Sequence, residues 1–265
     1  AEGVAPGTAN SLVSSLGSYW KWRVHRLGDG LNPWTNQTRR SPPDEALASK
    51  RPFTDEEVAT LLKGETYLTL HDLMRIGALT GMRLEEIARL RVKDTAGGEF
   101  DIRQAKTKAG VRRVPIHPAL EPLVVRRTAG KAPEAYLFDE LKDPPPGGKR
   151  ERSSKASERF TAYRRAIGIE ERGENQRQSN VDFHSFRRWF ITKAEQAGQP
   201  PHVISWVVGH ERAGETLGRY SGGPATDQMK AVVAAVQLPK DAPAKSPGGK
   251  RMGDGRWTEA VRRPG

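Results

Sequence analysis

The chain has 265 residues, of which 35% are hydrophobic and 29% are charged, and it contains no cysteine. This composition predicts a soluble protein of one large or two small domains, and it excludes disulfide frameworks, thiolate metal sites and cysteine nucleophiles. The 44 Lys and Arg against 32 Asp and Glu give a formal charge of +12, which favours a polyanionic partner such as nucleic acid over a basic protein that is merely soluble.

The N-terminal region predicts one amphipathic helix followed by a linker. Residues 11–27 carry apolar side chains about every fourth residue: Leu12, Leu16, Trp20, Val24 and Leu27. Turn formers and prolines without an apolar period follow, so residues 31–50 are expected to be a linker. The chain opens with Ala-Glu-Gly and not with Met, and it has no signal-peptide pattern, so we expect a fragment or a processed chain.

Three helices and a hairpin are predicted after the linker. Thr54 with three following acids indicates the N-cap of a helix that runs through Leu62. A second helix is expected over about residues 68–79, and a third begins near Arg83. Residues 99–117 have the pattern of two short strands around a turn that is rich in bases.

The remainder is predicted to be mostly helical. Residues 141–158, with PPPGGK and many charges, favour a mobile loop, with a DNA-facing loop as the alternative. Helices are expected at about residues 156–167, 184–197, 201–208 and 225–237. The apolar stripe of the last helix must be buried, either in its own domain or against a neighbouring protomer; it comprises Met229, Val232, Val233 and Val236. The final residues, 239–265, are expected to form a disordered basic tail.

Short polar motifs suggest chemistry when they are read together. Arg83 and Glu86 lie three residues apart at a helix start, a spacing that by itself most often means a solvated ion pair. His184 and Arg187 project from one face of another helix start, where a guanidinium fork matches phosphate oxygens; an ordinary basic helix is the alternative.

A histidine and a tyrosine complete the set of motifs. Val207-Val208-Gly209-His210 is followed, ten residues after the histidine, by Tyr220. A lone tyrosine is usually a packing residue, but a glycine-rich stretch could deliver its phenol to a substrate.

In this order, TGMRLEEI, KTKAGVRRVPI, HSFRRWF and VVGHERAGETLGRYSGG resemble the catalytic domain of the tyrosine recombinases, the phage integrase family. The resemblance implies a mainly α (α+β) fold, with a helical catalytic domain and a small antiparallel β-hairpin sheet. The expected domains are a remnant of the helical core-binding DNA clamp at 1–30, a linker at 31–50, the catalytic domain at 51–222, a C-terminal helix at 223–238 and the tail.

The resemblance also implies a role for each motif residue. Arg83 and Arg187 would grip the scissile phosphate, and His184 is the histidine of the family's H-x-x-R motif. His210 would hydrogen-bond the phosphate region, and Tyr220 would be the nucleophile.

Two further positions follow from the same resemblance. Glu86 would support Arg83 and its helix without donating a proton. The family's hairpin lysine is a general acid toward the leaving 5′ oxygen. Counted forward from the first strand, this position falls on Lys106. Counted back from Val114-Pro115, it falls between Lys106 and Lys108, so Lys108 is the alternative.

The implied activity is DNA strand exchange through 3′-phosphotyrosine intermediates, in a homotetramer on double-stranded DNA in the cytoplasm, associated with the nucleoid. Cations aimed at the phosphate would replace the metal ions of other phosphoryl-transfer sites, and no nucleotide cofactor is required. Phe186 and Arg188 depart from the family's usual leucine and histidine, and the gap from His210 to Tyr220 is one residue longer than the commonest, but no reacting group is lost.

Other classes of function are weighed against this one. Six histidines suggest a metal hydrolase, but there is no H-E-x-x-H pattern and no acid at ligand spacing. A non-catalytic DNA-binding module, a type IB topoisomerase and a telomere resolvase remain as alternatives.

Overall fold

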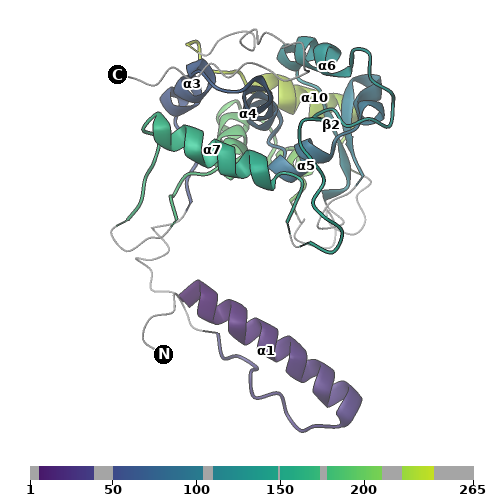
Figure 1. Cartoon of the computed structure of the whole chain (residues 1–265), viewed down its shortest axis with the longest axis vertical. Coiled ribbons are helices and arrows are strands. Elements are labelled where there is room, and N and C mark those ends of the chain that lie inside the picture. Colours follow the sequence, from purple (N-terminus) through teal and green to yellow (C-terminus); the bar gives the residue numbers. More distant parts are fainter. Residues whose placement is uncertain are drawn as a thin grey trace. The chain divides into compact units, whose positions relative to one another are not determined.

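Figure 1 shows the computed structural model of the chain, which describes residues 6–38, 50–103, 110–148, 150–173, 178–210 and 223–241. The chain divides into two units, one within residues 1–49 and one that begins at Lys50. Among the helices of the described residues, none combines the length and the apolar content that crossing a bilayer requires.

The first unit is built on α1 (Pro6–Leu27). The helix begins five residues before the predicted start, with Pro6 in its first position, where the missing N–H needs no partner. It ends before Gly28, whose φ of +70° is incompatible with a continuing helix. Asn32 then folds back, and its Nδ2 donates to the carbonyl oxygen of Gly17 at 3.0 Å, so this part of the predicted linker is fixed to the helix.

The second unit opens with helices that begin where local sequence signals predict. Thr54 caps α3 (Asp55–Lys63): its hydroxyl accepts from the backbone N–H of Glu57, while the Glu57 carboxylate accepts from the backbone N–H of Thr54. The next helix, α4 (Leu68–Thr80), is buried along its whole length. It ends at Gly81, whose φ of +64° directs the chain into α5 (Leu84–Arg89).

A two-stranded antiparallel sheet follows, as predicted. After the 3₁₀ segment η1 (Val92–Gly98), β1 (Glu99–Ile102) pairs with β2 (Arg112–Pro115). The register places Glu99 opposite Pro115 and Ile102 opposite Arg112. Residues 104–109, between the strands, lie outside the described residues.

Helices make up most of the rest of the described chain. They are η3 (Pro118–Leu120), α6 (Glu121–Thr128), α7 (Ser154–Ala166), α8 (His184–Gln196), α9 (Pro201–Val208) and α10 (Thr226–Ala235). The four helices predicted for this half agree with α7 to α10 to within two residues at each end. The sequence does not single out α6, whose buried positions include a charged residue, Arg127, beside Leu123 and Val124.

The segment predicted to be a mobile loop is anchored at its C-terminal end. The guanidinium of Arg152 is buried and lies 3.5 Å from the ring centroid of Tyr136. It also donates to the carbonyl oxygens of Ala88, at 2.9 Å, and Phe138, at 2.8 Å. The prediction of mobility is therefore wrong at this end, where buried hydrogen bonds hold the chain against the core.

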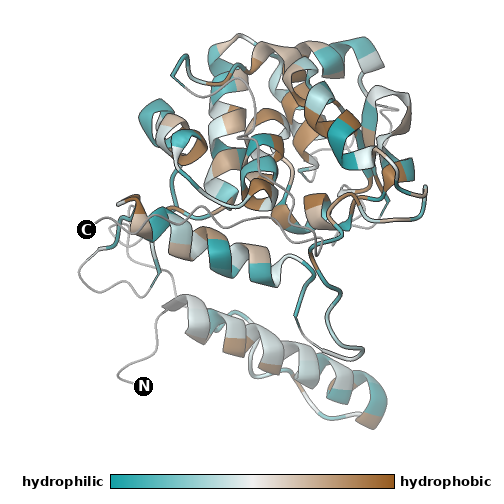
Figure 2. Cartoon of the chain, turned by 45° about the horizontal axis from the view of Figure 1, so that its top comes forward, coloured by the Kyte–Doolittle hydropathy of each residue, from teal (hydrophilic) through white to brown (hydrophobic). Residues whose placement is uncertain are grey.

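The core of the second unit fixes α8 against α4. Aromatic side chains meet edge to face between these helices and their neighbours, with ring centroids 4.8 Å apart for Phe53 and Phe186 and 5.3 Å apart for Phe160 and Phe183. Figure 2 shows hydrophobic residues alternating with hydrophilic ones along the helices of this unit. The apolar face of α8 is thus held rigidly in the core, which leaves its N-terminal end to present polar groups.

The last helix docks on its own unit. Val232, Val233 and Val236 are completely or almost completely buried, and α10 packs against α9, α8 and β2 of the same chain. Of the two predicted alternatives, burial in its own domain and burial against a neighbouring protomer, this chain shows the first. The sequence could not decide between them, because an apolar stripe has the same pattern whichever surface covers it.

This docking predicts a large loss of stability when charge is placed in the stripe. Val232→Asp combined with Val236→Asp should lower the free energy of unfolding by more than about 4 kcal/mol, because each buried carboxylate would lack a partner. Urea denaturation measures the change, with Ala231→Asp combined with Ala234→Asp as the control, since both alanines are exposed on the same helix. Equal effects of the two double variants would contradict the cis docking.

Candidate active site

Arg83 occupies the N-cap position of α5, directly after the turn at Gly81 and Met82. Its backbone N–H donates to the Glu86 carboxylate at 2.9 Å, and its Nη1 donates to the same carboxylate at 2.7 Å. Glu86 is only 6% exposed, so the interpretation of this pair as a solvated surface contact is wrong. One carboxylate thus fixes both the start of α5 and the direction of the Arg83 side chain.

A further arginine of this group, Arg112 on β2, was not among the predicted site residues. Its side chain is buried, and its Nη1 and Nη2 donate to the two oxygens of Glu86 at 3.2 and 3.0 Å. Its Nε donates to the carbonyl oxygen of Val207 at 2.7 Å, and Nη1 also donates to that of Gly110 at 2.8 Å. A single guanidinium therefore joins α5, the hairpin and the end of α9.

Glu86 remains ionised between these two arginines. Burial raises the pKa of its carboxyl, but the hydrogen bonds and charge of Arg112, and then the hydrogen bonds of Arg83, hold that pKa below its ordinary value. In the sequence, the only signal for Arg112 is that a basic residue stands at an inward-facing position of a strand. Because the hairpin contains several other basic residues, Arg112 does not stand out among them.

Arg187 lies one turn into α8 and is 1% exposed. Its Nη1 donates to the carbonyl oxygen of Gly81 at 2.8 Å, whereas its Nε and Nη2 have no hydrogen-bond partner among the described residues. Burial, followed by the charges of Arg83 and Arg112, lowers the pKa of Arg187 to about 9. A buried guanidinium with unused donors is costly unless an anion completes it.

Two histidines adjoin these arginines. His184 begins α8, and His210 follows α9 after the left-handed turn at Gly209, where φ is +70°. Burial, and then the charges of Arg188 and Arg187, lower the pKa of His184 to about 4. Burial, followed by the charges of Arg187, Arg83 and Arg112, also lowers the pKa of His210. Both imidazoles are therefore neutral at pH 7, and each offers one donor and one acceptor.

These groups form one cationic site, which we call the arginine site: Arg83, Glu86, Arg112, His184, Arg187 and His210. The ends of three helices and one strand converge there, although the residues span more than a hundred positions in the sequence. Three guanidinium groups face one carboxylate, so the site carries excess positive charge and unused buried donors. It is suited to bind a tetrahedral oxyanion such as a phosphate diester.

The structure brings together five of the residues predicted for the site, and the other three lie outside the described residues. Arg83, Glu86, His184, Arg187 and His210 meet as described above. The hairpin lysines, Lys106 and Lys108, and the tyrosine, Tyr220, fall within residues 104–109 and 211–222, which the structure does not describe. In the parts of the chain that it does describe, no three His, Asp or Glu side chains gather as a metal would require.

Comparisons with known proteins give a matching family model and structures of similar fold. The model of the phage integrase family matches residues 52–222, whereas a comparison with curated proteins found no match. Among the solved structures that share the fold are three integrases. The integrase from mycobacterium phage Brujita is 18% identical with a TM-score of 0.52, covering 89% of this chain and 74% of that one.

The other two are integrases bound to nucleic acid. The Tn1549 transposon integrase in complex with a circular intermediate DNA is 17% identical with a TM-score of 0.59, covering 87% of this chain and 79% of that one. A lambda integrase tetramer bound to a Holliday junction is 16% identical with a TM-score of 0.51, covering 78% and 59%. At these identities the likeness shows a common fold.

Proposed function

The chain belongs to the phage integrase family, the tyrosine recombinases, and from this premise we propose that it cleaves and rejoins DNA strands through a 3′-phosphotyrosine intermediate on Tyr220. The observation that carries the proposal is the buried guanidinium of Arg187, two of whose donor atoms have no partner among the described residues. A scissile phosphate would supply the missing acceptors.

The arginine site fits the charge that develops during such a reaction. In-line attack by the Tyr220 Oη on phosphorus forms the phosphotyrosyl bond and breaks the bond to the 5′ oxygen, so negative charge grows on the non-bridging oxygens. Arg187 and Arg83 would face these oxygens with donors held in place before the reaction. Glu86 and Arg112 would maintain their direction. Charge stabilisation by side chains would then take the role that metal ions have in other phosphoryl-transfer sites.

The remaining proton transfers involve the histidines and a hairpin lysine. One of the neutral imidazoles, His184 or His210, would accept the phenol proton of Tyr220 on its free ring nitrogen, and the other would donate a hydrogen bond to the phosphate region. Lys106, with Lys108 as the alternative, would protonate the leaving 5′ oxygen. Rejoining reverses these steps: a 5′-hydroxyl from another strand attacks phosphorus and Tyr220 departs. Because the phosphotyrosyl bond replaces a phosphodiester bond, no nucleotide cofactor is needed.

The proposed substrate is double-stranded DNA, exchanged within a homotetramer. The formal charge of +12 suits a polyanionic partner, and the related lambda integrase forms a tetramer on a Holliday junction. We further propose that residues 1–30 are the end of a DNA-clamping domain, that residues 51–222 form the catalytic domain and that the protein acts at the nucleoid.

Trapping a covalent adduct tests the proposal. A library of nicked duplexes with a randomised centre is incubated with the protein, and the SDS-resistant complexes are isolated and digested. A nucleotide found on Tyr220 by mass spectrometry supports the mechanism. Absence of any adduct, with DNA still bound, would favour a non-catalytic DNA-binding module. Relaxation of supercoiled DNA without strand exchange would favour the topoisomerase alternative.

The hairpin lysines can be separated by leaving-group chemistry. A 5′-phosphorothiolate linkage gives a leaving group that needs no acid, so it should restore cleavage by Lys106→Ala to near the parent rate. On the ordinary phosphodiester the same variant should be slower by about 10²–10⁴-fold. Single-turnover cleavage measures both rates. If the sulfur substrate restores Lys108→Ala and not Lys106→Ala, the acid is Lys108.

A further inference from the structure

The chain that leads into α8 has no regular secondary structure of its own. Residues 169–173 and 178–183, which we call the lead-in, contain neither helix nor strand. Yet this lead-in ends directly at His184 and one turn before Arg187, two members of the arginine site. Backbone hydrogen bonds of a helix or sheet cannot fix it, so other contacts must set its position.

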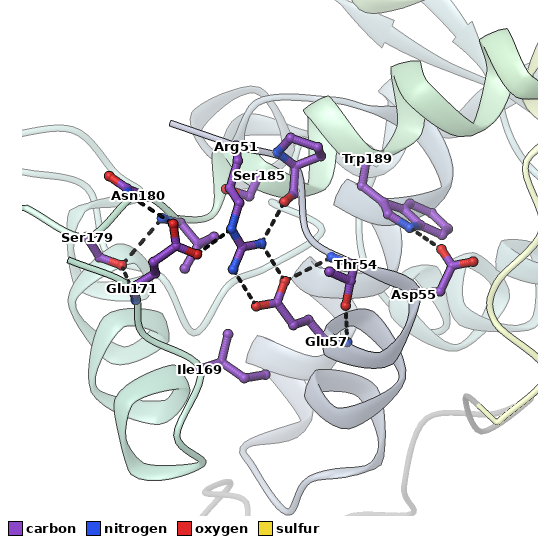
Figure 3. Close-up of polar contacts among 12 residues, drawn as sticks. Arg51, Thr54, Asp55, Glu57, Ile169, Glu171, Ser179, Asn180, Ser185 and Trp189 are labelled. Atoms are coloured by element: carbon purple, nitrogen blue, oxygen red, sulfur yellow. Dashed lines mark hydrogen bonds and ion pairs between the residues drawn. The ribbon is translucent and has the colours of Figure 1, made fainter. Parts of the chain in front are cut away.

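Arg51 supplies two of these contacts (Figure 3), in addition to those that the buried Arg164 makes to Ile169 and Ser179. Its backbone N–H donates to the carbonyl oxygen of Asn180 at 3.0 Å, and its Nε donates to the Glu171 carboxylate at 2.6 Å. Its Nη1 and Nη2 donate to the two oxygens of Glu57, each at 2.8 Å. Glu171 in turn accepts from the side-chain amide of Asn180 at 3.0 Å. We call these four residues the Arg51 clasp.

The neighbouring residue, Lys50, adds two contacts, one of which lies closer to the helix. Its Nζ donates to the carbonyl oxygen of Ser179 at 2.8 Å and lies 2.9 Å from the carboxylate of Asp182. Asp182 and Ser185 form a reciprocal turn at the start of α8, since each backbone N–H donates to an oxygen of the other residue. The ties from residues 50 and 51 therefore reach to within two residues of His184.

The other side of the clasp is a firm part of the fold. Glu57 belongs to the capping box of α3, so the Arg51 fork is bound to the start of that helix. Asp55, in the same turn, accepts from the indole N–H of Trp189 at 2.7 Å and pairs with Lys193 at 2.9 Å, both on α8. The start of α3 thus holds the middle of α8 directly and its lead-in through Arg51.

We propose that Arg51 is a positioning residue for the strand-cleavage reaction, acting through Glu171 and Asn180 to set the position of His184 and Arg187 at the N-terminal end of α8. This inference rests on the proposed function of the arginine site. Ion pairs that reach solvent, as the Arg51 pairs do, contribute little to folding stability, so the clasp should act mainly through geometry. A displacement of 1 Å at a reacting group can slow catalysis about 100-fold.

Glu171→Ala separates these effects, because it removes the side-chain bonds from Glu171 to Arg51 and Asn180 and leaves the Arg51–Glu57 pair, the α3 cap and the backbone bond from Arg51 to Asn180 in place. Glu170→Ala is the matched control: it removes the adjacent carboxylate, which pairs with Arg165 and Arg172, lies 4.0 Å from Arg164 and does not pair with residue 51. The substrate is the nicked duplex selected by adduct trapping. We expect Glu171→Ala to slow its single-turnover cleavage about tenfold and to leave the DNA affinity unchanged. Glu170→Ala should match the parent chain.

The NMR titration of His184 in the DNA-free protein gives a second, independent measurement. The groups that face this imidazole are Arg188, Arg187, Asp182 and Arg83, and its titration in the parent chain should be centred near pH 4. Loosening the lead-in would admit water, so Glu171→Ala should move the midpoint toward the ordinary value of about 6.5. Glu170→Ala should leave it unchanged.

The outcomes separate the inference from the function on which it rests. An unchanged cleavage rate and an unchanged His184 midpoint in Glu171→Ala, or equal changes in Glu170→Ala, would overturn the positioning role. If the parent chain cleaves no DNA, the proposed function fails. The titration midpoint of His184 then tests by itself whether the Arg51 clasp positions this residue. If Glu171→Ala does not fold, Arg51→Lys replaces it, because it keeps the charge, loses the fork and should give a smaller shift in the same direction.

Discussion

Tyr220→Phe is expected to abolish covalent adduct formation on DNA without changing DNA affinity. The phenyl ring fills the same volume but carries no oxygen, so no phosphotyrosyl bond can form. Binding should persist because it depends on the arginines and on contacts to the phosphate backbone. The loss should therefore be complete and confined to the chemical step. Gel-shift titration measures the affinity, and SDS-resistant complexes on the selected nicked duplex measure the adduct.

Tyr163→Phe is the matched control for this experiment. Its hydroxyl donates to the carbonyl oxygen of Leu61 at 2.8 Å, and burial raises the pKa of the phenol to about 12. A phenol that is held protonated away from the arginine site is a poor nucleophile, so this variant should form the adduct at the parent rate. An adduct that persists in Tyr220→Phe would assign the reaction to another residue, which digestion and mass spectrometry would identify.

Arg187→Lys is expected to slow strand cleavage by about 10²–10³-fold, the effect of removing one prearranged donor from a site of developing charge. An ammonium cannot donate to the Gly81 carbonyl and to a phosphate in the fork geometry of the guanidinium. Single-turnover cleavage of the nicked duplex measures the rate. Arg127→Lys is the control, because this buried arginine pairs with Asp72 and Glu140 and with no member of the arginine site. A parent-like rate in Arg187→Lys would end the assignment.

Replacing the same residue with methionine should have opposite effects on stability and activity. Arg187 is buried with two donor atoms unpartnered among the described residues, so Arg187→Met removes an uncompensated charge and keeps much of the volume. We expect the free energy of unfolding to rise by about 1–2 kcal/mol while cleavage is lost. A drop in stability, measured by urea denaturation, would mean that the guanidinium has a structural counter-ion in the free protein.

Local signals in the sequence predicted much of the fold. Thr54 and Glu57, three residues apart, form a capping box. The start of that helix therefore depends only on residues that are close in the sequence. The same holds for the end of α4 at Gly81, where a positive φ favours glycine. Arg83, His184, Arg187 and His210 could be placed in one site because the order of their motifs resembles a known family.

Contacts between distant residues could not be predicted in this way. Arg112 binds Glu86, Val207 and Gly110, and nothing in the sequence near residue 112 indicates these partners. The spacing of Arg83 and Glu86 alone favoured a solvated pair, because a spacing of three says nothing about burial; only the family resemblance pointed to Glu86 as the support of Arg83. The Arg51 clasp joins residues 120 positions apart and was likewise invisible. Tertiary packing decides which charged groups are buried, and single-sequence patterns do not record it.

Gly81 lies where three parts of the site meet, and this has a consequence for how the protein can vary. A Cβ atom there would lie 2.8 Å from the ring of Phe190 on α8 and 3.0 Å from the side chain of Val208 on α9, and the φ of +64° already disfavours any other residue. Its carbonyl oxygen also accepts from Arg187. Any side chain at residue 81 would therefore displace two helices at once: α8, which carries Arg187, and α9, which leads to His210. In a saturation library selected for recombination, this position should be the least permissive of the turn, with not even alanine surviving.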